Sequence, residues 1–185
     1  MKDIFPIEGA SVIVSDDMCD MNGHMNVRHY QTIPMDYDGN FYTSLGFGED
    51  YIAKGFSSFT AEQNIRYLKE CLKGEKLIPR FRMLNVNKKL YHYVCAICKE
   101  SDEVAALVES VEIHIDMSKR KSAQISDEIF ETMVRMQKEH ESFGDYPFDT
   151  KLKIKKFIIV LSYYPKIFFI PSENNRHHQC CWEHL

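Results

Sequence analysis

The sequence lacks a long uninterrupted apolar run and any strong excess of charge of one sign. Its net charge of −4 provides no basis for nucleic-acid binding, and we expect no nucleic-acid partner. Residues 1–6 contain no apolar core of the length that a signal peptide needs. The apolar run at 157–161 is too short for a transmembrane helix, and Pro165 soon interrupts its surroundings. We therefore predict a cytoplasmic protein with no membrane span.

Cysteine is present but is not arranged as a disulfide framework or a metal site. The six cysteines do not have the spacing of a small secreted scaffold, so we expect free thiols. Cys95 and Cys98 lie on a predicted strand, where positions three apart point to opposite faces. The tail residues His177, His178, Cys180, Cys181 and His184 lack the paired spacing of a closed zinc site. We predict no metal and no bound cofactor.

Two familiar catalytic signatures are also missing. The chain has no serine-centred nucleophile elbow and no glycine-rich phosphate loop. What it has is an ordinary globular composition, with 44% apolar and 27% charged residues over 185 positions. This length allows one domain with a sizeable core.

The hydrophobic pattern predicts an α+β domain. A short strand at 10–16 precedes a helix from about 26 to 46, which Pro34 and Gly39 should kink or break. Strands follow at 56–71, 76–86, 89–99 and 104–117, with turns short enough for an antiparallel meander. Ser126 should cap a second helix over 128–140. Tyr30, Ile33, Tyr37, Phe41 and Leu45 recur at helical spacing and should form core.

The segment Asp20-Met21-Asn22-Gly23-His24-Met25-Asn26 lies between the first predicted strand and the predicted helix. The first N–H groups of a helix have no internal partner and carry partial positive charge. A carbonyl oxygen can be polarised there, and a neighbouring carboxylate and imidazole can supply a nucleophile or a general base. Capping and turn formation alone would also explain this composition.

This segment, followed by an aromatic-containing helix, resembles the signature of hotdog-fold acyl-CoA thioesterases of the hydroxybenzoyl-CoA-thioesterase-like branch. It is also similar to a segment of plant acyl-carrier-protein thioesterases. Weaker matches follow in the expected order at 59–68, 90–93 and 114–117. The resemblance covers roughly residues 8–140. It implies a hotdog fold, in which an antiparallel sheet wraps a central helix.

The resemblance also implies roles for individual residues. Asp20 would act as nucleophile or general base, which the sequence does not decide, and Asn22 and His24 would orient it or handle protons. Glu62 would present a second acid from the following strand. Backbone N–H groups from Gly23 to Asn26, including that of Met25, would polarise the thioester carbonyl. Their placement at strand ends, rather than the resemblance, makes Lys88, Lys89, Lys119, Arg120 and Lys121 candidates for binding the CoA phosphates, and ordinary surface charge would also explain them.

We therefore predict an acyl-CoA thioesterase without a metal, in which CoA is part of the substrate. The family implies a homodimer or a dimer of dimers, with sites between protomers. A hotdog dehydratase or hydratase and a non-catalytic acyl-thioester-binding protein remain open as alternatives. We assign the hotdog domain to residues 1–143 and a linker with a basic, apolar tail to 144–185. The acyl group is not determined.

Overall fold

The computed structural model describes residues 1–154, and the predictions made for the apolar run at 157–161 and for the His/Cys cluster lie outside them. One antiparallel sheet, in the order β1-β4-β5-β6-β3, forms the body of the protein, with β2 beside β4 and β7 beside β6. The strands are β1 (Ile7–Glu8), β2 (Val12–Ile13), β3 (Phe56–Tyr67), β4 (Lys76–Val86), β5 (Leu90–Lys99), β6 (Val104–Asp116) and β7 (Lys121–Ser122). The helices are α1 (Val27–Asp36), α2 (Phe41–Ser44), α3 (Glu49–Ala53) and α4 (Asp127–Ser142).

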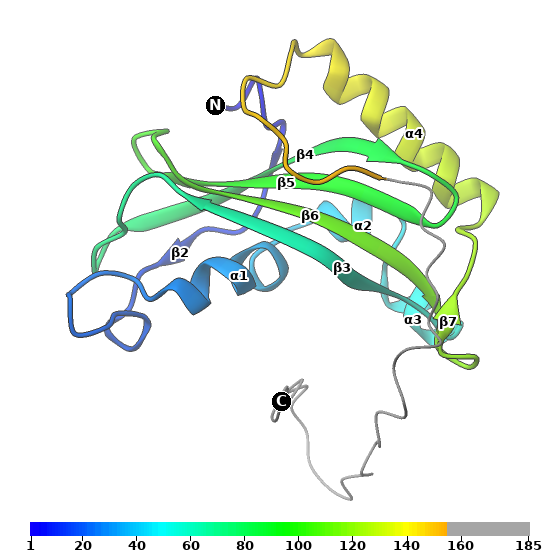
Figure 1. Ribbon diagram of the computed structural model, residues 1–185, viewed down its shortest axis with the longest axis horizontal. Coiled ribbons are helices and arrows are strands. Elements are labelled where there is room, and N and C mark those ends of the chain that lie inside the picture. Colours follow the sequence, from blue (N-terminus) through cyan, green and yellow to red (C-terminus); the bar gives the residue numbers. More distant parts are fainter. Residues whose placement is uncertain (155–185) are drawn as a thin grey trace, which may run out of the picture.

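The sheet curves over α1, α2 and α3, as Figure 1 shows. We call the face toward these helices the inner face and the opposite face the outer face. The main core lies on the inner face, where α1 and α2 meet side chains of β4, β5 and β6. The predicted helical stripe contributes Tyr30, Ile33, Phe41 and Leu45, all buried, so its assignment to the core is confirmed.

The segment predicted as one interrupted helix is broken into α1 and α2. Asn26 caps α1, because its side chain accepts a hydrogen bond from the Arg28 backbone N–H at 3.2 Å. The break lies at Gly39 rather than at Pro34, which α1 accommodates. Gly39 has a φ of +65°, and an added Cβ would stand 3.0 Å from the Cα of Gly9. Glycine therefore lets the chain turn sharply where it crosses the N-terminal segment.

A β-bulge in β3 changes which side chains face the helices. The register with β6 shifts between Thr60 and Glu62, so that Thr60 pairs with Glu112 and Glu62 pairs with Val111. In a regular strand Phe59 and Gln63 would lie on one face, because side chains alternate, but here they lie on opposite faces. A bulge inserts one unpaired residue, which reverses the alternation beyond it. Glu62 consequently shares the outer face with Val111.

The outer face is covered by residues 1–5 and by the segment 144–154, which we call the strap. Tyr146 and Phe148 pack against Phe5 and the neighbouring strands. The Arg66 guanidinium donates to the Asp149 carbonyl at 2.9 Å. Figure 1 shows the strap returning across the sheet after α4. The first part of the predicted linker is thus a packed layer of the fold.

Helix α4 closes the edge of β4 that β1 leaves open. Ser126 caps α4 as predicted, accepting from the Ile129 N–H at 3.4 Å. His140 is buried, and its Nδ1 accepts a hydrogen bond from the Met83 backbone N–H at 2.8 Å. Burial, helped by nearby Arg82, lowers the pKa of His140 to about 4. The imidazole therefore stays neutral and can replace a strand carbonyl at this edge.

Candidate active site

The loop from Asp20 to Asn26 lies beside the turn that follows β3. Two backbone hydrogen bonds hold it there, from the Met25 N–H to the Cys71 carbonyl at 2.8 Å and from the Asn26 N–H to the Met18 carbonyl at 2.9 Å. Gly23 has a φ of +81° and permits the tight turn inside the loop. These bonds fix the C-terminal end of the loop and tie it to the segment before Asp20, so the polar side chains are held at the start of α1.

Asp20 is oriented by the two residues that the sequence linked to it. One carboxylate oxygen, Oδ1, accepts the Asn22 backbone N–H at 2.8 Å. The other, Oδ2, lies 3.7 Å from Nε2 of His24. Asn22 therefore orients Asp20 through its backbone N–H, and the second carboxylate oxygen, Oδ2, faces the His24 imidazole. The structure brings Asp20, Asn22 and His24 together.

Glu70 is a further acid at this site that sequence reasoning missed. Its Oε2 lies 3.7 Å from Nδ1 of His24, so the imidazole stands between two carboxylates. Glu70 follows β3 and is far from the motif in sequence, and the pairing of the loop with Cys71 and Leu72 brings it close. No local sequence pattern around Glu70 or His24 indicates that the two side chains meet.

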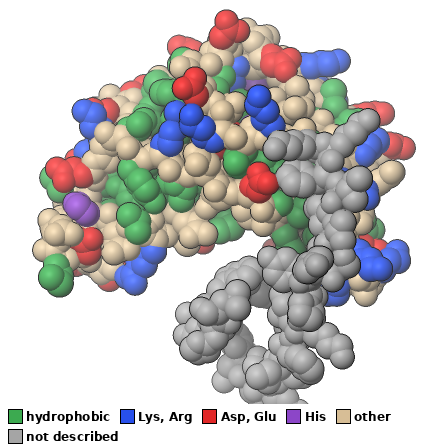
Figure 2. Space-filling view, viewed as in Figure 1, with side chains coloured by type: hydrophobic (Ala, Val, Ile, Leu, Met, Phe, Trp, Pro, Cys, Tyr) green, Lys and Arg blue, Asp and Glu red, His purple; other side chains and the backbone are tan. Residues whose placement is uncertain are grey.

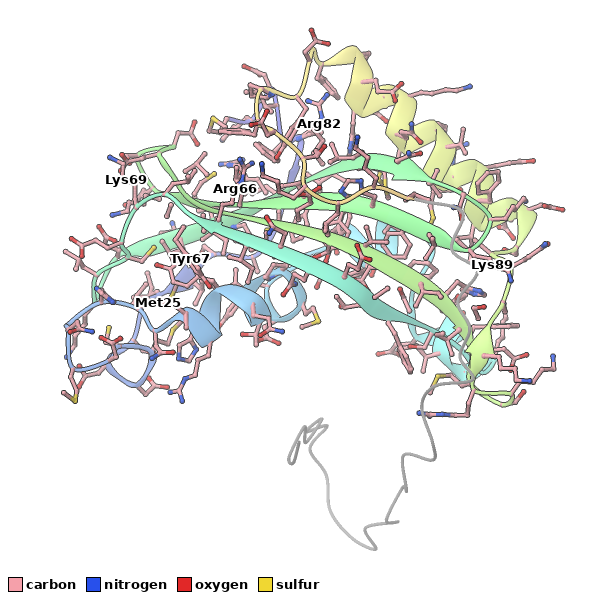
Figure 3. All side chains as sticks on the ribbon, in the orientation of Figure 1. Met25, Arg66, Tyr67, Lys69, Arg82 and Lys89 are labelled. Atoms are coloured by element: carbon pink, nitrogen blue, oxygen red, sulfur yellow. The ribbon has the colours of Figure 1, made fainter. Side chains whose placement is uncertain are left out.

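An open groove of ≈ 310 Å³ runs beside this cluster. Figure 3 shows Met25 and Tyr67, two of its lining residues, near one another beside the start of α1. In Figure 2, apolar side chains gather on this part of the surface. Three of the residues that line the groove, Val27, Tyr67 and Leu68, are exposed. The groove is lined by His24, Met25, Val27, Tyr30, Tyr67, Leu68, Lys69 and Glu70.

The structure narrows the choice of backbone donors for a carbonyl oxygen. The N–H groups of Gly23, Met25 and Asn26 already donate to the carbonyls of Asp20, Cys71 and Met18. Most of the candidate N–H groups from Gly23 to Asn26 are therefore used to build the loop. The N–H of His24 and that of Val27, the first residue of α1, remain as candidates.

The predicted phosphate-binding residues gather at the far end of the sheet. Lys88 and Lys89 occupy the β4–β5 turn, while Lys119, Arg120 and Lys121 follow β6. The Ile125 N–H donates a hydrogen bond to the Lys88 carbonyl at 2.7 Å, and the His114 N–H donates one to the Lys89 carbonyl at 2.9 Å. These bonds join the β4–β5 turn to β6 and to the segment that precedes α4. Lys88 pairs with Asp127, and Lys119 pairs with Asp116 at 2.8 Å.

One protomer does not bring this basic end to Asp20. Figure 3 places Lys89 and Met25 at opposite ends of the sheet. Strand β3 connects the two ends with 12 residues, which is about 36 Å of extended chain. Glu62 also stays apart from Asp20 within the protomer, because the bulge turns it to the outer face.

Other ligand-type residues do not form a site within residues 1–154. No group of three or more His, Cys, Asp or Glu side chains in this part could hold a metal ion. Cys95 belongs to the inner-face core and Cys98 to the outer-face cluster, so the prediction that they point to opposite faces is confirmed. No helix in the same residues is long and apolar enough to cross a membrane.

A curved sheet around a short helix, with this loop at the helix start, defines a thioesterase-like protein. The model of the thioesterase-like superfamily matches residues 14–133, and the chain belongs to this family. A similar curated protein is the L-carnitine dehydrogenase/betainyl-CoA thioesterase of Ruegeria pomeroyi, 33% identical over 151 residues. Its counterpart from Agrobacterium fabrum is 26% identical over 137 residues. The matches cover 82% and 74% of this chain but only 31% and 28% of those proteins.

Solved structures confirm the hotdog fold. A Staphylococcus aureus hypothetical protein in complex with CoA has a TM-score of 0.64 at 22% identity, covering 71% of this chain and 84% of its own. The 1,4-dihydroxy-2-naphthoyl-CoA thioesterase of Synechocystis has a TM-score of 0.59 at 15% identity, covering 69% and 94%. At these identities the likeness shows the fold, and the predicted α+β hotdog class is correct.

Proposed function

We propose that this protein hydrolyses acyl-CoA thioesters at the Asp20 loop. The observation that carries this proposal is the placement of an oriented carboxylate, next to an imidazole and an open groove, at the start of α1 in a thioesterase-like chain. The names of the curated relatives support the activity. The free thiols of Cys71, Cys95 and Cys98 suit a reducing compartment such as the cytoplasm.

The chemistry follows from the groups present. Either Asp20 adds to the acyl carbon, and water then cleaves the resulting anhydride, or Asp20 takes a proton from water as that water adds. In both routes the C–S bond breaks, the free acid leaves, and the thiolate receives a proton, for which His24 is placed. The N–H groups of His24 and Val27 would stabilise negative charge on the carbonyl oxygen.

We further propose that the working form is a homodimer, which can assemble into a dimer of dimers. Strand β3 ends the sheet and has one open edge, and such edges readily pair. Antiparallel pairing of two β3 strands would bring the basic end of one copy toward the Asp20 loop of the other. Light scattering should therefore give at least twice the chain mass, and a monomer with full activity would contradict this arrangement.

Release of CoA thiol, followed with a thiol-reactive dye, tests the activity. We would assay the full chain with short, long, branched, aryl and betainyl-CoA esters. Turnover of at least one ester, well above the rate without protein, is expected. A folded protein that binds these esters without cleaving any of them would refute the hydrolase and favour an acyl-thioester-binding role.

A further inference from the structure

Glu112 is a buried acid that the proposed reaction does not use. It lies on the inner face of β6, and its Oε1 accepts one hydrogen bond, from the Thr60 hydroxyl at 2.9 Å. The other buried carboxylates within residues 1–154 are better satisfied. Asp116 pairs with Lys119, and Glu109 accepts from His92 and from two backbone N–H groups of the strap. Glu112 alone among these three has a single neutral donor.

The polar groups around Glu112 are engaged with one another. The hydroxyls of Tyr42 and Tyr93 are hydrogen-bonded at 2.8 Å, and the Tyr91 hydroxyl is bonded to Ser58 at 2.8 Å. Among the residues described, no Lys, Arg or His side chain forms an ion pair with Glu112. Burial raises the pKa of this carboxyl to about 7. A carboxylate in such surroundings gains most from a positive charge brought to it.

Glu112 is close to a surface where a ligand can arrive. Thr60, its donor, is exposed and belongs to β3, the strand with the open edge. The carboxyl therefore lies next to an exposed residue of the edge strand, on the same face of the sheet as the helices. In the proposed dimer this edge is also where the second copy pairs, so Glu112 would lie between the two protomers.

We propose that Glu112 binds a positive charge carried by the acyl group, so that the protein prefers thioesters of cationic acids such as quaternary ammonium acids. This inference rests on the proposed thioesterase function and on the proposed dimer, because Glu112 does not line the groove of its own protomer and would approach the Asp20 loop of the other copy. It names the substrate class of that site. A fixed cation on the acyl group would pair with the Glu112 carboxylate, for which the described residues provide no positively charged partner. The relatives named betainyl-CoA thioesterases agree with it, because a betainyl group carries a quaternary ammonium.

Two substrates of equal shape test the inference. Betainyl-CoA and 3,3-dimethylbutyryl-CoA differ only in a cationic nitrogen or a neutral carbon at the branch. The kcat/KM of the native protein should be at least tenfold higher for betainyl-CoA. Glu112→Gln should reduce this ratio at least tenfold, while Glu131→Gln, at an exposed acid of α4, should keep it. A ratio near one in the native protein, or an unchanged ratio in Glu112→Gln, would overturn the inference.

Binding separates this inference from the proposed hydrolysis. Calorimetry on Asp20→Asn should show tighter binding of betainyl-CoA than of its neutral counterpart. Equal affinities would overturn the role of Glu112 even if both esters are cleaved by the native protein. Selective binding without turnover of any ester by the native protein would instead refute the hydrolase and leave the cation site standing.

Discussion

Replacement of Asp20 by asparagine is expected to lower kcat for acyl-CoA hydrolysis by roughly 10²–10⁴-fold. The amide keeps the size of the side chain and can still accept the Asn22 N–H, which now binds Oδ1 at 2.8 Å. It can neither add to the acyl carbon as a carboxylate nor take a proton from water. KM should change little, because the groove and the loop anchors remain.

Asp17→Asn provides the matched control for this prediction. Asp17 is an exposed acid in the turn that precedes the Cys19–Met25 pairing, and it does not line the groove. It should retain native kcat. If Asp20→Asn keeps full turnover with a substrate that the native protein cleaves, the assignment of the catalytic carboxylate is wrong and Glu70 becomes the acid to test.

The two buried glutamates of β6 should affect stability in opposite directions. Glu109→Ala is expected to lower the free energy of unfolding by about 3–5 kcal/mol. The reason is that Glu109 accepts from His92 at 2.9 Å, from the Lys151 N–H at 2.8 Å and from the Leu152 N–H at 2.9 Å. Removing the acceptor leaves all three donors unsatisfied beneath the strap.

Glu112→Gln should instead stabilise the protein above neutral pH. The pKa of Glu112 is raised from 4.5 to about 7 by burial. Below pH 4.5 the carboxyl is protonated in both states and costs nothing. Between pH 4.5 and 7 the unfolded chain loses this proton while the folded chain keeps it, so the free energy of unfolding falls as the pH rises. Above pH 7 the full penalty, roughly 3 kcal/mol, is present.

Chemical denaturation of the native protein and both variants at pH 5 and pH 8 checks this contrast. Glu109→Ala should be destabilised at both pH values, and Glu112→Gln should exceed the native protein only at pH 8. A loss of stability in Glu112→Gln at pH 8 would mean that Glu112 has a partner that stabilises its charged form, and would also weaken the proposed cation site.

Local sequence signals were enough for several parts of the fold. Asn26 and Ser126 cap helices because short polar side chains can accept the first free N–H groups. On β4, Leu77, Phe81 and Met83 lie on the inner face because side chains alternate along a strand. These features depend on residues a few positions apart, which a sequence displays directly.

The sequence also determined the family, since the segment from Asp20 to Asn26 and the order of later matches pointed to the hotdog thioesterases. Only the tertiary structure decided which acids stand together. Glu70 reaches His24 because the loop pairs with Cys71, whereas Glu62 leaves the inner face because of a bulge. Glu109 and Glu112 are indistinguishable as strand glutamates, yet one is fully hydrogen-bonded beneath the strap and the other is not. Such differences arise from contacts between segments distant in the chain, and packing rather than local pattern sets their register.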